Sequence, residues 1–320
     1  MTTILVTGAA GFIGRHLIKA LSRKVPDAFV IGLDRDAEIT ACNRRVVCDL
    51  SQTRIFQALE ALGPIDYVIH LAAQSYVHFS LSRPDIYIQN NILATSNLVQ
   101  ALATQGSLKR FLLVSSCEVY GDTQSPACET DNLKPRTPYA ASKLAQEHFV
   151  LSAIEHQRLP AVVCRLFNNY GWGQQSNRLI PRIMQALASD RQFELIGDGS
   201  QTRDWIAVED TCDALICVLF EKRVSTGAVF NVASEEVYSV MQVLQLCEGA
   251  SQKQVLIQQS QKDTGHLNMS LGNAERLRSV TGWRRQRDLP GFLAALAEET
   301  LNASKWLGCQ ELGLRARGIS

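Results

Sequence analysis

The first half of the chain alternates short apolar runs with longer amphipathic stretches. Apolar runs bounded by turn residues predict buried strands of a parallel sheet, and the amphipathic stretches between them predict helices. The alternation predicts an α/β fold of the Rossmann type, a doubly wound parallel sheet. We expect strands at residues 4–6, 28–34, 44–50, 65–75, 111–116 and 161–168, and helices at 15–24, 51–62, 84–106 and 139–156.

Beyond residue 168 the alternation becomes irregular and helical patterns dominate. Residues 177–190, 273–280 and 290–307 predict helices, and 193–199 predict a short strand. We expect the runs RDWIAV and VFNVAS to return to the main sheet or its edge. The chain then divides into a domain at 1–168, with returning segments near 204–235, and a smaller, mostly helical lobe at 169–320. The cleft between them is the expected site of ligand binding.

Composition narrows the classes of protein. The formal net charge is +1, which gives no electrostatic footprint for nucleic acid or an anionic membrane. The nine cysteines show no zinc-type spacing, so we expect reduced thiols and no metal site. No apolar run approaches the roughly 18 residues that a membrane span needs, and the N-terminus has no signal-peptide pattern. We expect a cytoplasmic protein with no membrane or nucleic-acid partner.

A glycine turn follows the first predicted strand. In TGAAGFIG, Gly8, Gly11 and Gly14 have the spacing that allows a tight turn and close approach of the backbone to a pyrophosphate, with Phe12 and Ile13 between them. Asp34 ends the next strand, 20 residues beyond Gly14. Its carboxylate can accept hydrogen bonds from the adenosine ribose and would repel a 2′-phosphate, which favours NAD over NADP. The neighbouring Arg35 weakens that preference.

Further cofactor contacts are expected where later strands end. Asp49 and Leu50 follow the third strand, where an adenine edge can be met. The fourth strand ends in small residues that let a cofactor lie against the backbone. Besides the glycine turn and Asp34, the expected NAD contacts at strand ends are Asp49, Leu50, Leu71, Ala72, Ala73, Ser75 and Ser115. Asn91, Tyr139 and Lys143, in predicted helices, are further expected NAD contacts.

The chemistry is predicted between Ser115 and Lys143. Tyr139 and Lys143 stand four residues apart, on one face of a predicted helix. A lysine held close to a tyrosine lowers the pKa of the phenol, which lets it act as a base toward an alcohol that loses hydride. The run FLLVSS delivers Ser116, Cys117 and Glu118 to the end of the fifth strand. A lone YxxxK pattern is weak evidence, and the upstream motifs give it weight.

In this order and at these intervals, TGAAGFIG, Asp34, LAAQS, VSSCEVYG and PYAASK resemble the extended short-chain dehydrogenase/reductases, specifically the nucleotide-sugar epimerase and dehydratase family. The segment LAAQSYVHFSLSRPD is most similar to GDP-mannose 4,6-dehydratases. RLFNNYGWGQ, RLIP and GDGSQTRDWIAVEDTCDAL are more similar to dTDP-glucose 4,6-dehydratases. The resemblance covers nearly the whole chain and implies NAD as cofactor and a nucleotide-diphosphate sugar as substrate.

The resemblance implies roles for the central residues. Tyr139 matches the base that oxidises carbon 4 of the sugar, and Ser116 matches the hydroxyl that polarises the forming ketone. Glu118 matches the base that removes the proton from carbon 5 in a 4,6-dehydratase. Cys117 stands where the dehydratases carry aspartate or serine, and either an acid role for the thiol or a space-filling role is open.

The resemblance also implies the substrate contacts: Ser75, Asn168, Arg178, Leu179, Arg203 and His266. Arg203 is a candidate for the diphosphate, since a guanidinium meets phosphate oxygens in pairs. His266 lies in DTGH, which is similar to an RPGH motif, but Asp263 with Lys262 beside it replaces the expected arginine. A homodimer is implied, through the long helices beginning near Pro84 and Tyr139.

Three other functions compete with a 4,6-dehydratase. A UDP-sugar 4-epimerase uses the same tyrosine but needs no base at carbon 5, so Glu118 favours the dehydratase. The sequence Ser-Cys-Glu also resembles tunicaminyl-type UDP-N-acetylglucosamine 5,6-dehydratases, which stop at an exocyclic alkene. A non-catalytic NAD-sensing scaffold is the third, and the intact serine, tyrosine and lysine argue against it because a binding module needs no activated phenol.

Overall fold

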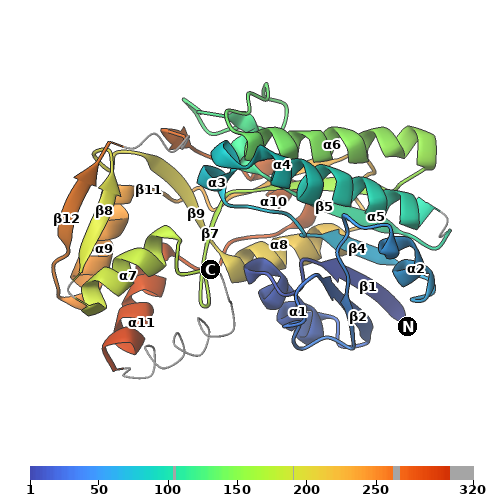
Figure 1. Ribbon diagram of the computed structural model, residues 1–320, viewed down its shortest axis with the longest axis horizontal. Helices are drawn as coiled ribbons and strands as arrows, with labels where there is room; N and C mark the ends of the chain where they lie inside the picture. The colour runs from blue at the N-terminus through green and yellow to red at the C-terminus, as the bar shows by residue number, and fades with distance from the viewer. Residues whose placement is uncertain (104–105, 190, 262–266, 303–320) are drawn as a thin grey trace.

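A parallel seven-stranded sheet forms the centre of the larger lobe (Figure 1). The computed structural model describes residues 1–103, 106–189, 191–261 and 267–302. The strands of this sheet are β1 (Thr2–Thr7), β2 (Ala28–Asp34), β3 (Arg44–Val47), β4 (Tyr67–His70), β5 (Arg110–Ser116), β6 (Ala161–Leu166) and β10 (Val229–Val232). Their order is β10-β6-β5-β4-β1-β2-β3, and each neighbouring pair is parallel. The predicted doubly wound α/β fold is confirmed.

Helices cover both faces of this sheet (Figure 1). They are α1 (Phe12–Lys24), α8 (Val208–Phe220) and α10 (Glu275–Thr281) on one face, and α2 (Arg54–Glu60), α5 (Ala94–Ala103) and α6 (Pro138–Gln157) on the other. Two separate apolar clusters result, one on each side of the sheet. Because the inner strands are buried on both faces, their side chains are apolar nearly without alternation, whereas the edge strand β3 is largely exposed.

A second lobe follows β6. It holds a small sheet of β7 (Asn168–Tyr170), β9 (Thr202–Ala207), β11 (Val237–Ser239) and β13 (Met269–Ser270), and a parallel pair of β8 (Gln192–Ile196) and β12 (Leu256–Ser260). Helices α7 (Leu179–Ser189), α9 (Val240–Ser251) and α11 (Leu289–Asn302) pack around a third apolar cluster. This lobe lies at one end of the molecule, beside the larger one (Figure 1).

The run RDWIAV departs from the expectation, whereas VFNVAS meets it. VFNVAS supplies β10, the edge strand of the main sheet beside β6. RDWIAV lies in β9, which pairs with β7, β11 and β13 of the small sheet. β10, and not β9, is therefore the strand that lies beside β6.

The predicted long helix over 84–106 is divided. It begins as α4 (Pro84–Tyr87), passes through a π-helical turn, η1 (Ile88–Leu93), and continues as α5. Short α3 (Val77–Ser82) precedes it. The π turn contains Asn91, whose side chain donates to the carbonyl oxygen of Gln74 and to the hydroxyl of Ser142, at 3.2 Å and 2.8 Å. Turns of this kind are rare and occur often beside functional sites.

The strand order reverses between β1 and β4, which places the carboxyl ends of both beside a crevice. The glycine turn follows β1 there. The strand predicted for 65–75 ends early, at His70, and residues 71–75 leave the sheet. Likewise β3 ends at Val47, before Asp49 and Leu50. The expected ligand contacts therefore lie on loops that leave the sheet at this edge.

Candidate active site

One cavity of about 1150 Å³ runs across the carboxyl ends of these strands and into the second lobe. It brings together nearly all of the residues that the sequence singled out. Those lining it are Gly8, Gly11, Phe12, Ile13, Gly14, Asp34, Asp49, Leu50, Leu71, Ala72, Ala73, Ser75, Ser115, Ser116, Cys117, Glu118, Tyr139, Lys143, Asn168, Arg178, Leu179 and Arg203.

Two expected contacts are not among them. Asn91 is fully buried behind the wall, where its amide oxygen accepts from the backbone N–H of Gln74 at 2.7 Å. Its position suits holding the 71–75 loop rather than touching a ligand. His266, with Lys262 and Asp263, lies outside the described residues.

The glycine turn forms a cradle at one end of the cavity. Gly8 has φ +70°, and a Cβ there would lie 2.8 Å from the backbone nitrogen of Ala72. A Cβ on Gly14 would lie 2.1 Å from the carbonyl oxygen of Gly8. Helix α1 begins after Gly11, with no side-chain cap and no acidic residue in its first turn. Its first backbone N–H groups are thus available to an anion, as a pyrophosphate requires.

Asp34 lies at the end of β2 on the cavity wall. Its carboxylate accepts from the backbone N–H of Ala10 at 3.0 Å and from that of Asp36 at 3.1 Å. These contacts fix the carboxylate beside the glycine turn, where it can accept from ribose hydroxyls. Arg35 donates to the side-chain oxygen of Asn90 at 3.4 Å. Both residues belong to the cavity wall.

Tyr139 and Lys143 lie on the first turns of α6, which starts at a Thr137 cap and Pro138. Both side chains are almost completely buried. The Lys143 ammonium donates to the carbonyl oxygen of Val114 at 2.7 Å, and burial lowers the pKa of Lys143 to about 7. Burial likewise raises the pKa of the Tyr139 phenol, an effect that a hydrogen bond with Ser116 and the charge of Arg178 oppose.

The expected electrostatics of this pair therefore need correction. From the sequence we expect Lys143 to be the cation that makes Tyr139 acidic. In the protein alone, burial is the largest effect on the pKa of both groups, because each has lost most of its contact with water. Among the side chains that lower the pKa of the phenol, Ser116 has the largest effect, through a hydrogen bond.

Glu118 sits in the short 3₁₀ turn η2 (Cys117–Tyr120), directly after β5. Its backbone N–H donates to the Ser116 hydroxyl oxygen at 3.3 Å, which caps the turn. One carboxylate oxygen is buried and has no hydrogen-bond partner within the part of the chain that the structure describes. Burial raises the pKa of Glu118 to about 7, although the charges of Arg203 and Arg136 lower it. A carboxyl group with such a pKa can take up and release a proton near neutral pH.

Cys117 precedes Glu118 and is 4% exposed. Its sulfur accepts a hydrogen bond from the hydroxyl of Ser270 at 3.3 Å. Burial raises the pKa of the thiol to about 12. The described cysteines of the chain, Cys117 included, are free thiols.

Two arginines face the cavity from the second lobe. Arg178 donates to the hydroxyl of Ser75 at 3.1 Å, and its guanidinium lies 5.7 Å from the ring centre of Tyr76. Arg203 is 7% exposed and donates to the carbonyl oxygens of Thr202 at 2.8 Å and Leu267 at 2.6 Å. A guanidinium has five N–H donors, so each arginine keeps donors for a ligand.

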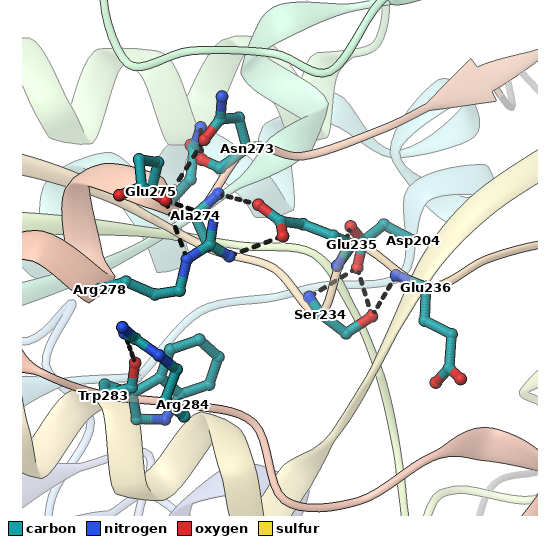
Figure 2. Close-up of polar contacts among 11 residues, drawn as sticks. Asp204, Ser234, Glu235, Glu236, Asn273, Ala274, Glu275, Arg278, Trp283 and Arg284 are labelled. Carbon is teal, nitrogen blue, oxygen red and sulfur yellow. Dashed lines mark hydrogen bonds and ion pairs between the residues drawn. The ribbon is translucent and has the colours of Figure 1, made fainter.

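A polar cluster holds the strand that carries Arg203 (Figure 2). Asp204 accepts from the backbone N–H and the hydroxyl of Ser234 and from the backbone N–H of Glu235, at 2.9 to 3.0 Å. Glu235 in turn accepts from the backbone N–H of Ala274 at 2.9 Å and pairs with Arg278 at 2.6 Å. This cluster ties β9 to the segment after β10 and to α10, and so fixes where Arg203 points.

Sequence reasoning missed several residues of the cavity wall. Asn169 and Gln201 both line it, and each has a buried side-chain oxygen to which no described residue donates a hydrogen bond. Arg182 also lines it, one helical turn beyond Arg178. The sequence placed two of these residues beside predicted contacts. Asn169 adjoins Asn168, and Gln201 lies two residues before Arg203 in the same motif.

The chain matches the model of a family described as the NAD dependent epimerase/dehydratase family over residues 4–233. The chain belongs to this family. NAD is accordingly its cofactor, and the glycine cradle, the uncapped start of α1 and Asp34 fit that dinucleotide. The extended short-chain dehydrogenase/reductase resemblance is thereby confirmed.

Similar proteins include both dehydratases and epimerases. The dTDP-glucose 4,6-dehydratase of Neisseria meningitidis is 30% identical over 344 residues, 96% of this chain and 95% of that protein. A trifunctional UDP-glucose 4,6-dehydratase/UDP-4-keto-6-deoxy-D-glucose 3,5-epimerase/UDP-4-keto-L-rhamnose-reductase of Arabidopsis thaliana is 32% identical over 255 residues. That match takes in 75% of this chain but 38% of the longer protein.

Two solved structures of this family share the fold. The dTDP-glucose 4,6-dehydratase from Streptomyces venezuelae, with NAD bound, aligns with TM-score 0.88 at 25% identity, covering 95% of this chain and 98% of that one. The UDP-glucuronic acid 4-epimerase from Bacillus cereus, in complex with UDP-glucuronic acid and NAD, aligns with TM-score 0.87 at 26% identity, covering 94% and 99%. The chain is thus an enzyme of the nucleotide-sugar modifying group.

Among the described residues, no helix is long and apolar enough to cross a membrane. Within the same part of the chain, no group of three or more histidine, cysteine, aspartate or glutamate side chains is placed to hold a metal ion.

Proposed function

We propose that this enzyme is a nucleotide-sugar 4,6-dehydratase. It converts a nucleotide-diphosphate hexose into the 4-keto-6-deoxy product by oxidation at carbon 4, loss of water across carbons 5 and 6, and return of the hydride. The observation that carries the proposal is Glu118, a carboxylate on the cavity wall, in the same short segment as Ser116. A 4-epimerase has no step that needs a base at this point.

Each residue then has a chemical task. Tyr139 removes the proton of the carbon 4 hydroxyl, and Ser116 donates to the forming carbonyl oxygen. Bound NAD supplies the hydride acceptor and, in its oxidised form, a positive charge that favours the phenolate. The new carbonyl acidifies the hydrogen on carbon 5, because the resulting carbanion is stabilised as an enolate, and Glu118 removes that proton.

The second lobe supplies the candidate substrate contacts. Arg178, Leu179, Arg203 and Asn168 line the cavity from the second lobe, whereas the glycine cradle belongs to the larger lobe. We place the boundary between the NAD-binding domain and the substrate-binding lobe near Asn168, where β6 leads into β7.

We also propose a homodimer. The surface near Pro84 carries three exposed aliphatic side chains, Leu81, Ile88 and Leu93, which are 44%, 60% and 44% exposed. A second copy of the helices here and of α6 would cover them. Light scattering coupled to size-exclusion chromatography tests this: a monomer at micromolar concentration contradicts it.

The activity is tested by incubating the purified protein with UDP-, dTDP-, GDP- and CDP-hexoses and following loss of water by mass spectrometry. The proposal expects a 4-keto-6-deoxy product from one of these, with no net consumption of NAD. Glu118→Gln is expected to keep NAD binding and to lose both water elimination and deuterium incorporation at carbon 5. Full dehydration by that variant would show that another group is the base.

Two alternative outcomes have specific support. Inversion at carbon 4 without loss of water would make the enzyme an epimerase, as the similarity to the Bacillus cereus UDP-glucuronic acid 4-epimerase favours. Release of an exocyclic 5,6-alkene would make it a 5,6-dehydratase, which the Ser-Cys-Glu sequence at 116–118 favours. Proton NMR of the product distinguishes the three.

A further inference from the structure

Arg165 is a buried cation at which three segments of the chain meet. It lies on β6 beside Ser115 of β5 and is 4% exposed. Its guanidinium donates to the carboxylate of Glu147 through Nε at 3.1 Å and through Nη2 at 2.8 Å. Through Nη1 it donates to the hydroxyl of Tyr120 at 2.9 Å and to the carbonyl oxygen of Glu129 at 3.2 Å. One side chain thus joins α6, the turn η2 and the loop between them.

The contact with Glu147 restrains the face of α6 that carries the candidate base. Tyr139, Lys143 and Glu147 follow one another at intervals of four residues, so they lie on the same face of the helix. All three are buried. Burial lowers the pKa of Lys143, and the carboxylate of Glu147 opposes that effect. Because Arg165 bonds to both oxygens of this carboxylate, it limits rotation of α6 about its own axis and so fixes where Tyr139 points.

The contact with Tyr120 restrains the turn that carries Glu118. Tyr120 ends η2, two residues after Glu118. Its hydroxyl accepts from Arg165 and donates to the side-chain oxygen of Asn231 at 2.7 Å. The side-chain nitrogen of Asn231 donates to the carbonyl oxygen of Ala127 at 2.7 Å, which fixes the orientation of that amide. The guanidinium also lies 4.9 Å from the centre of the Tyr120 ring. The position of η2 is therefore set relative to Arg165.

We infer that Arg165 is a positioning residue, which sets the separation between Glu118 on η2 and Tyr139 on α6. The inference rests on the proposed dehydratase function, in which Tyr139 serves the oxidation at carbon 4 and Glu118 serves the elimination that follows. Both groups must then reach neighbouring carbons of one bound sugar. A misplacement of about 1 Å at either group can slow its step by about 10²-fold. Arg165 is not among the described residues that line the cavity, so it acts through the two elements that it joins.

The chemistry of the side chain at this place supports alignment more than stability. A buried ion pair is weak evidence for stability, because the loss of hydration offsets the attraction between the charges. A guanidinium is a planar fork whose N–H groups point in fixed directions. At Arg165 one edge of the fork meets Glu147 on α6 and another N–H meets Tyr120 on η2. An arginine therefore fixes two elements relative to each other, which a compact ammonium cannot do in the same way.

Single-turnover measurements on the full-length enzyme separate the two steps. Absorbance of the reduced nicotinamide reports oxidation at carbon 4, and mass spectrometry of quenched samples reports loss of water. Tyr120→Phe removes the contact with η2 and leaves the pair of Arg165 and Glu147 in place. We expect oxidation to change by less than about twofold and elimination to slow by about 10- to 10²-fold. Reduced cofactor then accumulates during turnover, which a general loss of stability does not produce.

Glu147→Gln tests the other contact. It keeps the shape of the side chain but removes the charge that Arg165 meets on α6. Oxidation is expected to slow by about tenfold or more, and no reduced cofactor accumulates because the first step then limits turnover. Tyr67→Phe is the matched control for the tyrosine substitution. Tyr67 begins β4 and is not among the described residues that line the cavity, so neither step is expected to change.

A double variant tests whether Tyr120 acts through Arg165. Arg165→Lys keeps the charge but has no planar fork, so it is expected to slow both steps. Adding Tyr120→Phe to it is expected to slow elimination little further, because the contact between the two side chains is already lost. Additive effects on elimination would mean that Tyr120 acts through Asn231, and they would overturn the inference.

Two further results overturn the inference and leave the dehydratase function intact. One is an unchanged elimination rate in Tyr120→Phe. The other is equal slowing of both steps in Tyr120→Phe and in Glu147→Gln, which is expected of contacts that serve only the stability of the fold. Should Tyr120→Phe not fold, an unchanged oxidation rate in Glu147→Gln overturns the inference instead. A wild-type enzyme that inverts carbon 4 without losing water overturns the dehydratase function, and the inference with it.

Discussion

The ammonium of Lys143 donates a hydrogen bond to the carbonyl oxygen of Val114 at 2.7 Å, which ties the helix of the candidate base to the central strand β5. This lysine is 3% exposed, and burial lowers its pKa to about 7, well below its ordinary value. Burial therefore makes the charged form of Lys143 unfavourable in the folded state. As a result, the free energy of unfolding is expected to depend on pH.

Lys143→Met is expected to change how stability varies with pH. Below pH 7, Lys143 is protonated in both folded and unfolded chains, and the folded state bears the cost of a buried charge. Above pH 7 the folded chain releases the proton while the unfolded chain keeps it, so the wild type gains stability as pH rises. Between pH 7 and 9 this gain is about 2 to 3 kcal/mol relative to Lys143→Met. Urea unfolding of both proteins across this range measures it, and parallel curves would contradict it.

Glu118→Gln is expected to stabilise the protein while abolishing its elimination activity. Burial raises the pKa of Glu118 from 4.5 to about 7, so the folded chain binds the proton more tightly than the unfolded chain between these values. Wild-type stability relative to the variant thus falls as pH rises from 4.5 to 7, by about 3 kcal/mol in total. The control is Glu60→Gln, which removes an exposed carboxylate on α2. Equal stabilities at pH 8 would show that Glu118 is not desolvated.

Gly14→Ala and Gly249→Ala form a matched pair of substitutions within helices. A Cβ on Gly14 would lie 2.1 Å from the Gly8 carbonyl oxygen, whereas one on Gly249 in α9 meets nothing within 4 Å. Gly14→Ala must shift the glycine turn and is expected to weaken NAD binding at least tenfold, measured by calorimetric titration. Gly249→Ala is expected to leave NAD affinity unchanged and to stabilise the protein by about 0.5 to 1 kcal/mol, because alanine restricts the unfolded chain. Equal NAD affinities would contradict the close packing at Gly14.

The buried pair of Glu147 and Arg165 is expected to couple α6 to β6. Arg165 donates to both carboxylate oxygens of Glu147, at 3.1 and 2.8 Å, and also to the hydroxyl of Tyr120 at 2.9 Å. Replacing either partner with methionine leaves an unpaired buried charge and is expected to cost about 3 to 5 kcal/mol. The double variant is expected to cost much less than the sum, since neither charge remains. Thermal unfolding of the wild type, the two single variants and the double variant measures these differences in stability.

The exposed pair of Arg83 and Asp85 provides the comparison. Its side chains are 53% and 63% exposed, so water already solvates both charges. Asp85→Asn is expected to leave the unfolding midpoint unchanged within error.

For the buried pair, additive effects of the Glu147 and Arg165 substitutions on stability would contradict the coupling of α6 to β6.

The sequence by itself determined the sheet and one side of the cavity. Strands such as β2 and β5 are apolar runs buried on both faces, and this pattern is local and nearly independent of the remaining chain. The sequence predicted the glycine turn and the pair of Tyr139 and Lys143, because their spacing reflects the geometry of one turn and one helix. The resemblance of these motifs to the nucleotide-sugar epimerase and dehydratase family implied that NAD is the cofactor.

Tertiary structure decided what depended on contacts between distant segments. β10 takes the edge of the main sheet and β9 pairs outside it, an arrangement that no local pattern encodes. The π turn contains Asn91, whose side chain bonds to Gln74 and Ser142, 17 and 51 residues away. The pKa of Lys143, and the contact that fixes Cys117 through Ser270, depend on burial and on the meeting of two lobes, since solvation is a property of the folded surroundings and not of the residue.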